Sequence, residues 1–333
     1  MLRIGIAGLG VISEVHRKVI GSLQGEAEVT AVCDCDIRKK EKALGAEFYT
    51  DLAEMLKNER LDCLHICLPH HLHVPAAKLA ASMGVSVLME KPAGLNTEDI
   101  DVLLRNEDLG RIHLGVCFQH RYDASVQTML KILEEGTYGK LLGCKAVVTW
   151  NRTRDYYDRD PWRGKTAEAG GGVMLSQAVH TMDLMELFCG KPVWTKGMAG
   201  NLFLEDIEVE DTACGFTMFE KDVHGVFYGT VTHCRNSSIE LEITTENGVF
   251  FLRDDKLVLF KDGQETVLAE DHAEGAGKDY YGYSHSRAIR EFYRMLNGSG
   301  GSCVSLKEAR KISVLIDKIQ ESAETGKRVY FDL

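Results

Sequence analysis

The sequence predicts two domains: an α/β domain built on a doubly wound parallel sheet, followed by an α+β domain with a mostly antiparallel sheet. A chain of 333 residues exceeds what one ordinary hydrophobic core supports. Its first third alternates short apolar runs with helical patterns, which is typical of parallel strands joined by helices. The alternation stops near Arg121, and short strands separated by turns follow. We therefore expect domains at residues 1–120 and 121–333.

The first domain is expected to contain five strands buried on both faces, because these segments are β-branched and almost continuously apolar. The segments between them place apolar residues at helical spacing, which predicts amphipathic helices. The expected strands are 2–7, 27–33, 63–68, 86–89 and 112–118, and the expected helices are 13–23, 37–44, 52–58, 73–83 and 97–105.

The second domain is expected to begin with a helix that ends at Gly136 and to continue through a charged, aromatic loop after Trp150. A second helix then leads into short strands separated by turn residues, a pattern that indicates an antiparallel sheet. Two further helices close the chain. The expected strands are 213–219, 225–231, 239–244, 248–252 and 256–260, and the expected helices are 125–135, 173–188, 284–296 and 305–325.

Composition limits the partners and the compartment. A formal net charge of −11 disfavours a nucleic-acid backbone or an anionic membrane surface as a partner. The chain runs from Met1 directly into a glycine turn, which leaves no room for a signal peptide, and it holds no long uncharged apolar stretch. The 10 cysteines are scattered through apolar segments without a Cys-x-x-Cys pair. We expect a cytoplasmic protein with reduced thiols, no nucleic-acid or membrane partner and no metal site.

The turn after the first strand is typical of dinucleotide binding. Gly8 permits a tight turn, Gly10 lets the backbone approach a pyrophosphate, and Ser13 is small enough for close packing of helix on strand. The following helix, which begins with Val11 and Ile12, directs its amide groups and its positive dipole end at the phosphates. We therefore predict a Rossmann domain whose turn binds the cofactor through these residues.

An acidic residue at the end of the second strand predicts which dinucleotide binds. Asp34 lies beyond the usual spacing of about 20 residues after the glycine turn, but it ends the strand as the pattern requires. Its carboxylate can accept both hydroxyls of the adenosine ribose and would repel a 2′-phosphate, which favours NAD over NADP. Arg38 and Lys39 lie close enough to weaken that preference, so NADP stays an alternative. Asp34 could instead be a loop residue or a helix cap.

Further motifs identify a family. They are Ile66-Cys-Leu-Pro69-His-His-Leu-His73, Glu90-Lys91-Pro92, Gln119-His-Arg121-Tyr, Trp162-Arg163-Gly164, Gly170-Gly-Gly172-Val-Met-Leu, His180-Thr-Met-Asp183-Leu and Ala323-Glu-Thr-Gly-Lys327. Together with the glycine turn they resemble the glucose–fructose oxidoreductase, inositol dehydrogenase and rhizopine-catabolism family, often written Gfo/Idh/MocA. The resemblance spans essentially the whole chain.

The resemblance implies roles for these motifs. The nicotinamide side of the cofactor would be lined by Leu68, Pro69 and His73 and adjoined by the turn Glu90, Lys91 and Pro92, and Gln119 would also bind the cofactor. This turn would place Lys91 beside the nicotinamide, and Lys91 and His180 would flank the carbinol of the substrate. The second sheet would be open and would commonly supply the oligomer interface, which implies a homodimer or homotetramer.

The chemistry that these residues support is the oxidation of an alcohol. Hydride transfer needs a base for the hydroxyl proton, and His180 suits this role because the ordinary pKa of histidine is ~6.5. Lys91 can hydrogen-bond the same oxygen or relay its proton, although lysine is usually an exposed surface residue. Asp183 shares a helix face with His180 and could orient the imidazole, bind substrate or bond to backbone. We predict Lys91 and His180 as the catalytic residues.

The sequence departs from the family at one informative position. Many members carry an aspartate four residues before the active-site histidine, where this chain has Ser176, followed by Gln177. Serine cannot act as a charged partner, so the proton-handling role of that aspartate does not transfer. His180 and Lys91 therefore carry more of the expected mechanism.

A loop rich in donors and flat rings predicts the contacts to a small polyol or sugar-like substrate. Most of its residues could instead belong to an interface or a solvated surface. His16, His113, His224 and His272 are expected to be packing or surface residues. The expected substrate contacts are Lys91, Arg152, Tyr157, Trp162, Arg163, Gln177, His180, Asp183, Tyr281 and His285.

Three functions fit this pattern. The first is an NAD-dependent dehydrogenase acting on a secondary alcohol of a sugar, cyclitol or sugar derivative. The second is an NAD-dependent glycoside hydrolase, in which transient oxidation permits elimination and the same cofactor is then reoxidised. The third is a catalytically silent sensor that binds NAD. Retention of both Lys91 and His180 argues against the sensor, and accumulation of free NADH would separate the first function from the second.

Overall fold

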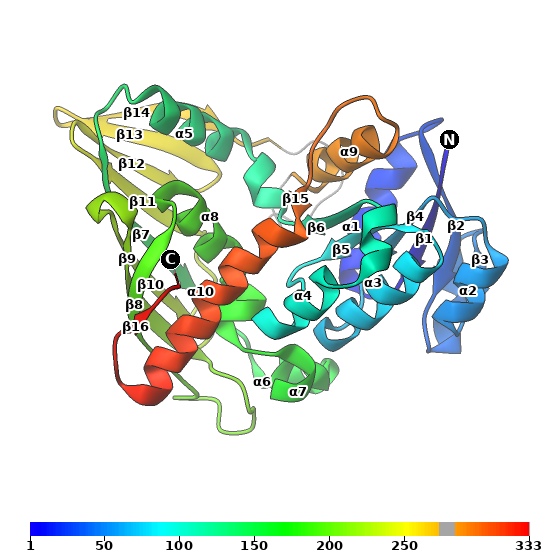
Figure 1. The fold of residues 1–333 in the computed structure, drawn as a ribbon. Helices are drawn as coiled ribbons and strands as arrows, with labels where there is room; N and C mark the ends of the chain where they lie inside the picture. The colour runs from blue at the N-terminus through cyan, green and yellow to red at the C-terminus, as the bar shows by residue number, and fades with distance from the viewer. Residues whose placement is uncertain (273–283, 333) are drawn as a thin grey trace. The chain divides into compact units, whose positions relative to one another are not determined.

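The structure is a computed structural model that describes residues 1–272 and 284–332. Its elements form two compact units. Unit 1 comprises Met1–Gln119 and Ala273–Arg310, and unit 2 comprises His120–His272 and Lys311–Leu333. Each unit is built on one sheet with helices packed against it (Figure 1).

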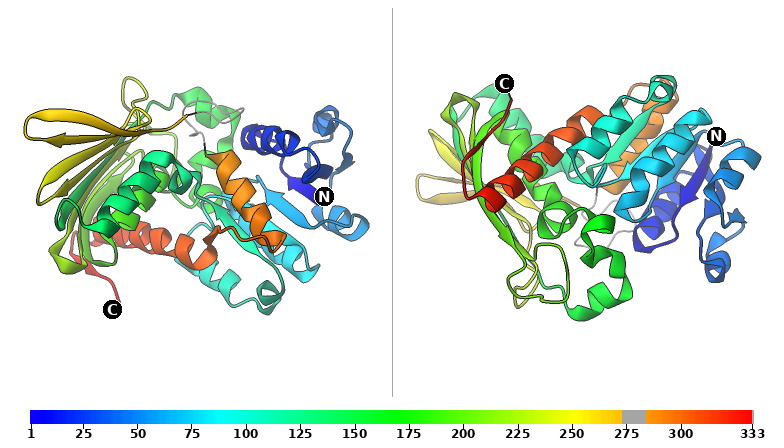
Figure 2. Two further views of the ribbon diagram at one scale, coloured as in Figure 1. Left: turned by 90° about the horizontal axis from the view of Figure 1, so that it is seen from above. Right: turned by 60° about the horizontal axis from the view of Figure 1, so that its bottom comes forward.

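Unit 1 contains a seven-stranded sheet in the order β15-β6-β5-β4-β1-β2-β3. The strands β1 to β6 pair in parallel, and β15 joins one edge antiparallel. Helices α1 and α9 pack together on one face, and α2, α3 and α4 cover the other (Figures 1 and 2). The doubly wound parallel sheet is therefore confirmed. The strands are β1 (Leu2–Ala7), β2 (Ala27–Cys33), β3 (Glu47–Tyr49), β4 (Cys63–Ile66), β5 (Ser86–Glu90), β6 (Leu114–Cys117) and β15 (Val304–Ser305), and the helices are α1 (Val11–Ser22), α2 (Leu52–Asn58), α3 (His73–Ser82), α4 (Thr97–Leu104) and α9 (His285–Leu296).

The core of unit 1 explains why its strands are apolar throughout. Ile4 of β1, Val32 of β2 and Leu88 of β5 are at most 1% exposed and pack in one cluster with Phe292 of α9. Strands covered by helices on both faces have no polar side to alternate with. Residues 284–310 lie with unit 1 because α9 packs on α1 and β15 pairs with β6. The division at residue 120 into separable domains stays a prediction.

Unit 2 contains a nine-stranded sheet in the order β14-β13-β12-β11-β7-β10-β9-β8-β16. Neighbouring strands are antiparallel except β7 and β10, which pair in parallel, so the predicted mostly antiparallel sheet is confirmed. The strands are β7 (Leu141–Thr149), β8 (Pro192–Gly200), β9 (Thr212–Phe219), β10 (His224–Thr230), β11 (Glu240–Thr245), β12 (Gly248–Arg253), β13 (Lys256–Lys261), β14 (Gln264–Glu270) and β16 (Val329–Tyr330), and the helices are α5 (Ala124–Glu135), α6 (Arg154–Arg159), α7 (Thr166–Ala169), α8 (Val179–Cys189) and α10 (Leu306–Thr325), which continues from unit 1.

Helices cover one face of this sheet and leave the other open. Within unit 2, α8 packs on β7 and β10, and α5 packs on β13 and β14 (Figures 1 and 2). On β10 the side chains alternate, so that Phe227 is fully buried while Val226 and Tyr228 are 42% and 41% exposed. The alternation is typical of a strand with one covered face and one open face.

Several elements differ from the sequence expectation. The segment Ile37–Ala43 is a 3-10 helix rather than an α-helix, and Asp36 caps it. The expected helix 173–188 is divided into a π-helix, Val173–Gln177, and α8. The strands that were not expected are β3, β7, β8, β14, β15 and β16. Three of these are only two or three residues long, and β7 and β8 contain glycine and lysine, which lower strand propensity.

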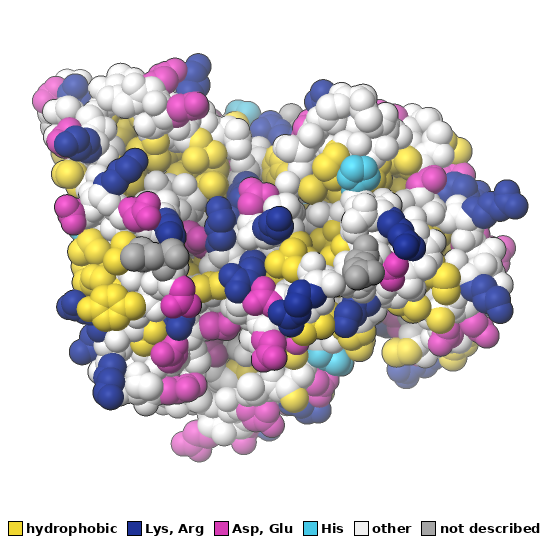
Figure 3. All heavy atoms as spheres, viewed as in Figure 1, with side chains coloured by type: hydrophobic (Ala, Val, Ile, Leu, Met, Phe, Trp, Pro, Cys, Tyr) yellow, Lys and Arg dark blue, Asp and Glu magenta, His cyan; other side chains and the backbone are white. Residues whose placement is uncertain are grey.

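Basic and acidic side chains alternate over the face of the molecule shown in Figure 3. Across residues 1–272 and 284–332, no helix is both long enough and apolar enough to cross a membrane.

Candidate active site

The glycine turn of unit 1 lies between β1 and α1, as the sequence predicts. Gly8 has φ +91°, and a Cβ at this position would collide with the carbonyl oxygen of Cys67, so only glycine fits. Gly10 is the N-cap of α1, and a Cβ there would meet no heavy atom of the described chain within 4 Å. Open space and helical amide groups therefore adjoin the turn, which is the arrangement that a pyrophosphate requires. Val11 is 40% exposed, whereas Ile12 is partly buried.

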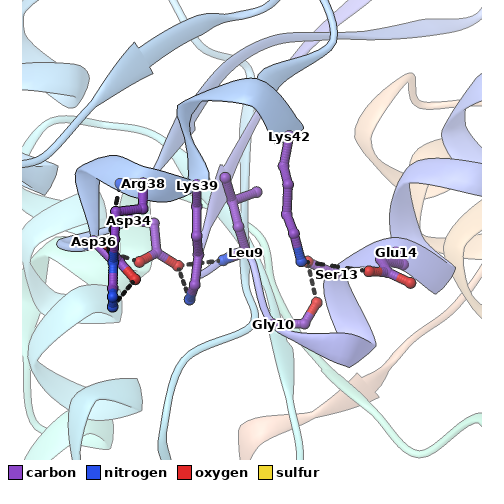
Figure 4. Close-up of polar contacts among 9 residues, drawn as sticks. All are labelled: Leu9, Gly10, Ser13, Glu14, Asp34, Asp36, Arg38, Lys39 and Lys42. Carbon is purple, nitrogen blue, oxygen red and sulfur yellow. Dashed lines mark hydrogen bonds and ion pairs between the residues drawn. The ribbon is translucent and has the colours of Figure 1, made fainter.

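Asp34 lies beside this turn with its carboxylate held by three donors (Figure 4). Oδ2 accepts the amide of Leu9 at 2.8 Å and the ammonium of Lys39 at 2.8 Å, and Oδ1 accepts the amide of Asp36 at 3.0 Å. Burial opposes ionisation, but these donors lower the pKa of Asp34 below its ordinary value. Asp34 is thus an ionised carboxylate beside the glycine turn, with a lysine paired to it, and its contact with the adenosine ribose stays a prediction. Arg38 is instead paired to Asp36.

The turn that carries Lys91 is braced by a buried histidine. His73, at the start of α3, directs Nδ1 at the carbonyl oxygen of Pro92 at 2.7 Å and Nε2 at that of Leu68 at 2.8 Å. Its ring therefore joins the loop after β4 to the Lys91-Pro92 turn, whose peptide bond is cis. Burial lowers the pKa of His73 although the two carbonyl groups favour its charged form. Both ring nitrogens of His73 thus face backbone carbonyl groups of the protein. Its contact with the cofactor stays a prediction.

Glu90 is the last residue of β5 and lies in a buried polar cluster. Nε2 of His16 lies 2.9 Å from Oε1 of Glu90, and Nε2 of His285 lies 3.6 Å from the same oxygen. The ligand atoms of these three residues and of Cys117 all lie within 4.8 Å of one another, a set that could hold a metal ion. Burial opposes the charge on Glu90, but the two histidines hold its pKa well below the ordinary value.

In unit 2, the glycine-rich segment leads into α8 through the π-helix. Gly170 has φ +80°, and a Cβ on Gly172 would overlap the carbonyl oxygen of Glu210. The carboxylate of Glu210 accepts the amides of Gly172 at 2.7 Å and Met174 at 3.0 Å, so it caps the start of the π-helix. Sequence reasoning missed Glu210, because it lies 36 to 38 residues from the groups that it caps.

His180 lies in the first turn of α8 and is 7% exposed. Its ring meets that of His120 edge-on, with centroids 5.0 Å apart and planes at 76°. Nδ1 of His120 lies 2.7 Å from Oδ2 of Asp123. Burial disfavours a charge on His120, but Asp123 outweighs it and raises the pKa of His120 above its ordinary value. A second, charge-paired histidine therefore adjoins the predicted base.

Asp183 is held by a guanidinium one helical turn from His180. Arg121 donates to both carboxylate oxygens of Asp183, from Nε at 2.8 Å and from a terminal nitrogen at 2.7 Å. The side chains are 14% and 2% exposed, so this is a buried bidentate pair. The pairing supports a role for Asp183 in fixing α8, and its substrate contact stays a prediction. Glu186 lies on the same helix, and burial followed by the charge of Asp183 raises its pKa to about 8.

The predicted substrate loop assembles around Tyr156, a residue outside the predicted contact set. Its hydroxyl accepts from Arg163 at 2.6 Å and from Gln177 at 3.2 Å. The guanidinium groups of Arg152 and Arg163 lie 5.3 Å and 4.6 Å from the centre of the Tyr156 ring, and that of Arg163 lies 4.9 Å from the Trp162 ring. The structure thus brings four predicted substrate residues together: Arg152, Trp162, Arg163 and Gln177.

The remaining predicted residues are placed differently. Tyr157 is 7% exposed, and burial raises the pKa of its hydroxyl strongly. His285 lies in the Glu90 cluster of unit 1 at the start of α9. Tyr281 lies outside the described residues. Gln119 is 2% exposed, and Ser176 directs its hydroxyl at the carbonyl oxygen of Gly171 at 3.3 Å. The functional roles of all these residues stay predictions.

Comparison with known families accounts for both units. Residues 2–109 match the family described as "Oxidoreductase family, NAD-binding Rossmann fold", and residues 126–251 match the "GFO/IDH/MocA C-terminal domain". The chain belongs to the Gfo/Idh/MocA family, as its motifs predict. It is an NAD-binding oxidoreductase of the dehydrogenase class, which confirms the predicted cofactor and enzyme class.

Named relatives cover most or nearly all of the chain at low identity. The chain is 22% identical to myo-inositol 2-dehydrogenase of Thermotoga maritima over 98% of each protein. It is 23% identical to levoglucosan dehydrogenase of Pseudarthrobacter phenanthrenivorans, covering 82% of this chain and 81% of the relative. Among solved structures, the WlbA dehydrogenase of Bordetella pertussis, in complex with NADH and UDP-GlcNAcA, superposes with a TM-score of 0.86 at 25% identity, covering 100% of this chain and 99% of WlbA.

Proposed function

We propose that this protein oxidises a secondary alcohol of a sugar, cyclitol or sugar derivative with NAD, using His180 as the base and Lys91 as the second group on the reacting oxygen. The observation that carries the proposal is the pair of hydrogen-bond contacts on either side of Lys91. Glu90 before it and Pro92 after it are each engaged by a buried histidine. A lysine on an ordinary surface turn would not need such bracing.

NAD, when bound, supplies the hydride acceptor, and the protein supplies position and proton management. His180 accepts the proton of the substrate hydroxyl, since imidazole gains and loses protons near neutral pH. The ammonium of Lys91 hydrogen-bonds the same oxygen and stabilises the negative charge that develops on it. The glycine turn and Asp34 bind the two ends of the adenosine diphosphate portion.

The substrate class is supported by the cluster around Tyr156. Flat rings suit the apolar face of a sugar, and guanidinium groups donate to its hydroxyl or carboxylate oxygens. Arg152 makes no ion pair with a carboxylate within residues 1–272 and 284–332, and its Nε is buried without a hydrogen bond there. Two relatives are named as dehydrogenases of myo-inositol and levoglucosan, and the WlbA dehydrogenase was solved with UDP-GlcNAcA. Each of these three molecules contains a polyhydroxylated ring.

The assembly and the compartment are part of the same proposal. Val226 and Tyr228 expose apolar side chains on the open face of the unit 2 sheet, which supports its use as an interface in a homodimer or homotetramer. We place the protein in the cytoplasm on the basis of its cysteines, which are all free in the structure.

The experiment incubates purified protein with NAD or NADP and a panel of sugars, cyclitols, uronic acids and aryl glycosides, and records reduced cofactor and released aglycone. The expected result is stoichiometric NADH with at least one polyol, lost in Lys91→Ala and His180→Ala but kept in the surface control His113→Ala. Aglycone release without net NADH would replace this proposal with the hydrolase, and full activity in Lys91→Ala would refute the catalytic assignment.

A further inference from the structure

Two buried histidines of unit 1, His65 and His16, form a continuous chain of hydrogen bonds that runs from Tyr293 to Glu90. The hydroxyl of Tyr293 on α9 lies 2.9 Å from Nε2 of His65 on β4. Nδ1 of His65 lies 2.7 Å from Nδ1 of His16 on α1, and Nε2 of His16 lies 2.9 Å from Oε1 of Glu90. The four residues come from four different elements, and none is more than 5% exposed.

The direction of the last bond follows from the acceptors available. A hydroxyl of Tyr293 that donates to His65 leaves the proton of His65 on Nδ1, from which it donates to Nδ1 of His16. The proton of neutral His16 must then lie on Nε2, facing Glu90. If His16 is instead doubly protonated, the two upstream bonds reverse, but Nε2 still donates to Glu90. Because the pKa of Glu90 is held well below its ordinary value, its carboxylate is ionised and can only accept, so Nε2 of His16 is the donor in both states.

The charges of the neighbouring groups are consistent with this chain of hydrogen bonds, which pairs the buried carboxylate of Glu90. Burial lowers the pKa of His65 well below its ordinary value, so His65 is neutral. Burial and the neighbouring Glu90 raise the pKa of Cys117, so its thiol stays protonated and does not compete as an anion. An isolated ionised carboxylate in such a site would be strongly destabilised, and the hydrogen bond from His16 together with the nearby His285 ring offsets that cost.

We infer that Tyr293, His65 and His16 are positioning residues, which orient Glu90 from one side while His73 holds Pro92 from the other, and so fix Lys91 for the reaction. The inference rests on the proposed role of Lys91. Glu90 is adjacent to Lys91 in the chain and ends β5. With Oε1 of Glu90 bonded to His16 and the carbonyl of Pro92 bonded to His73, the backbone on both sides of Lys91 is restrained. A site held within a fraction of an ångström needs such support.

The test compares His16→Leu, which removes the donor to Glu90, with His16→Gln, whose side-chain amide can replace Nε2. We expect His16→Leu to lower kcat at least tenfold while KM for NAD changes less than threefold, and His16→Gln to recover most of kcat. Because Glu90 loses its donor in His16→Leu, the acid limb of the kcat–pH profile should move to higher pH. Tyr293→Phe should show a smaller loss, and Tyr49→Phe, which removes a hydroxyl bonded to Glu59, should change neither kcat nor the profile.

Three results would overturn the inference. The first is that the His16→Leu variant folds and keeps the wild-type kcat and kcat–pH profile, while Lys91→Ala is inactive. The second is an equal loss in His16→Leu and His16→Gln that tracks only the fraction of folded protein. The third is stoichiometric zinc in purified protein whose removal by a chelator abolishes activity, since the cluster would then be a metal site. Full activity in Lys91→Ala would refute the proposed function instead.

Discussion

Replacing Lys39 by methionine should sharpen the preference for NAD over NADP. Nζ of Lys39 lies 2.8 Å from Oδ2 of Asp34, beside the site expected for the adenosine ribose (Figure 4). The ammonium neutralises the carboxylate that would otherwise repel a 2′-phosphate, and it can itself bind that phosphate. Methionine keeps the length and apolar stem of the side chain and removes the charge.

The magnitude follows from exposure and charge. Lys39 is 34% exposed on its side chain and Asp34 is 7% exposed, so the pair lies between surface and interior. Unit charges 4 Å apart interact by about 1 kcal/mol in water and about 4 kcal/mol at the effective dielectric constant of a protein surface. Discounting for solvent screening gives roughly 1–3 kcal/mol against the phosphate, or about a fivefold to hundredfold change in selectivity.

The assay measures kcat/KM with each cofactor at fixed substrate. We expect Lys39→Met to lower the NADP-to-NAD ratio of kcat/KM by about fivefold to hundredfold. Since Lys39 occupies an acceptor position on Asp34 that a ribose hydroxyl could use, KM for NAD should fall or stay the same. The control is Lys40→Met. Lys40 is the next residue in the chain and its side chain is exposed, so this variant removes the same charge. An unchanged ratio in Lys39→Met, or an equal change in Lys40→Met, would refute the reasoning.

Three further predictions concern unit 2. The pKa of Glu186 is about 8 in the folded protein against an ordinary 4.5, so the unfolded state ionises first and stability should fall as pH rises from about 4.5 to 8. Urea unfolding across this range should show the slope, and Glu186→Gln should flatten it; parallel slopes would contradict the shift. Gly172→Ala would place a Cβ on the carbonyl oxygen of Glu210 and should cost at least ~3 kcal/mol, visible as a large fall in Tm or in soluble yield. Arg121→Met leaves Asp183 buried without its guanidinium and should lower the free energy of unfolding by about 3–5 kcal/mol. The double variant Arg121→Met, Asp183→Leu should recover part of that loss. An Arg121→Met variant as stable as wild type would count against the pairing.

The parallel sheet and the geometry of the glycine turn could be predicted because their signals are local. The glycine turn, the strands on either side and Asp34 lie within one short stretch of chain, and the geometry of Gly8 depends on its own backbone. The 3-10 helix at Ile37–Ala43 was expected as an α-helix, because apolar spacing does not distinguish tighter turns. Strands β3, β15 and β16 are too short to show a period.

The partners of the site residues could not be predicted, because they are distant in sequence. His16 was expected to be a packing or surface residue, yet its two ring nitrogens face residues 49 and 74 positions away. Tyr293 meets its histidine across 228 positions. Lone histidines carry no local signal of a hydrogen-bond chain, and these side chains meet only once α1 and α9 have packed on the folded sheet. The same is true of Tyr156, which gathers Arg163 and Gln177 from separate elements.

The central claim is that Lys91 and His180 carry out NAD-dependent oxidation of a polyhydroxylated substrate. The most direct measurement is the time course of reduced-nicotinamide absorbance for wild type, Lys91→Ala, His180→Ala and His113→Ala with the best substrate of the panel. Steady accumulation of NADH in wild type and His113→Ala, with at least a hundredfold loss in the other two despite unchanged NAD binding, is expected from transition-state interactions worth about 3 kcal/mol or more. Accumulation at the wild-type rate in either active-site variant would contradict the claim.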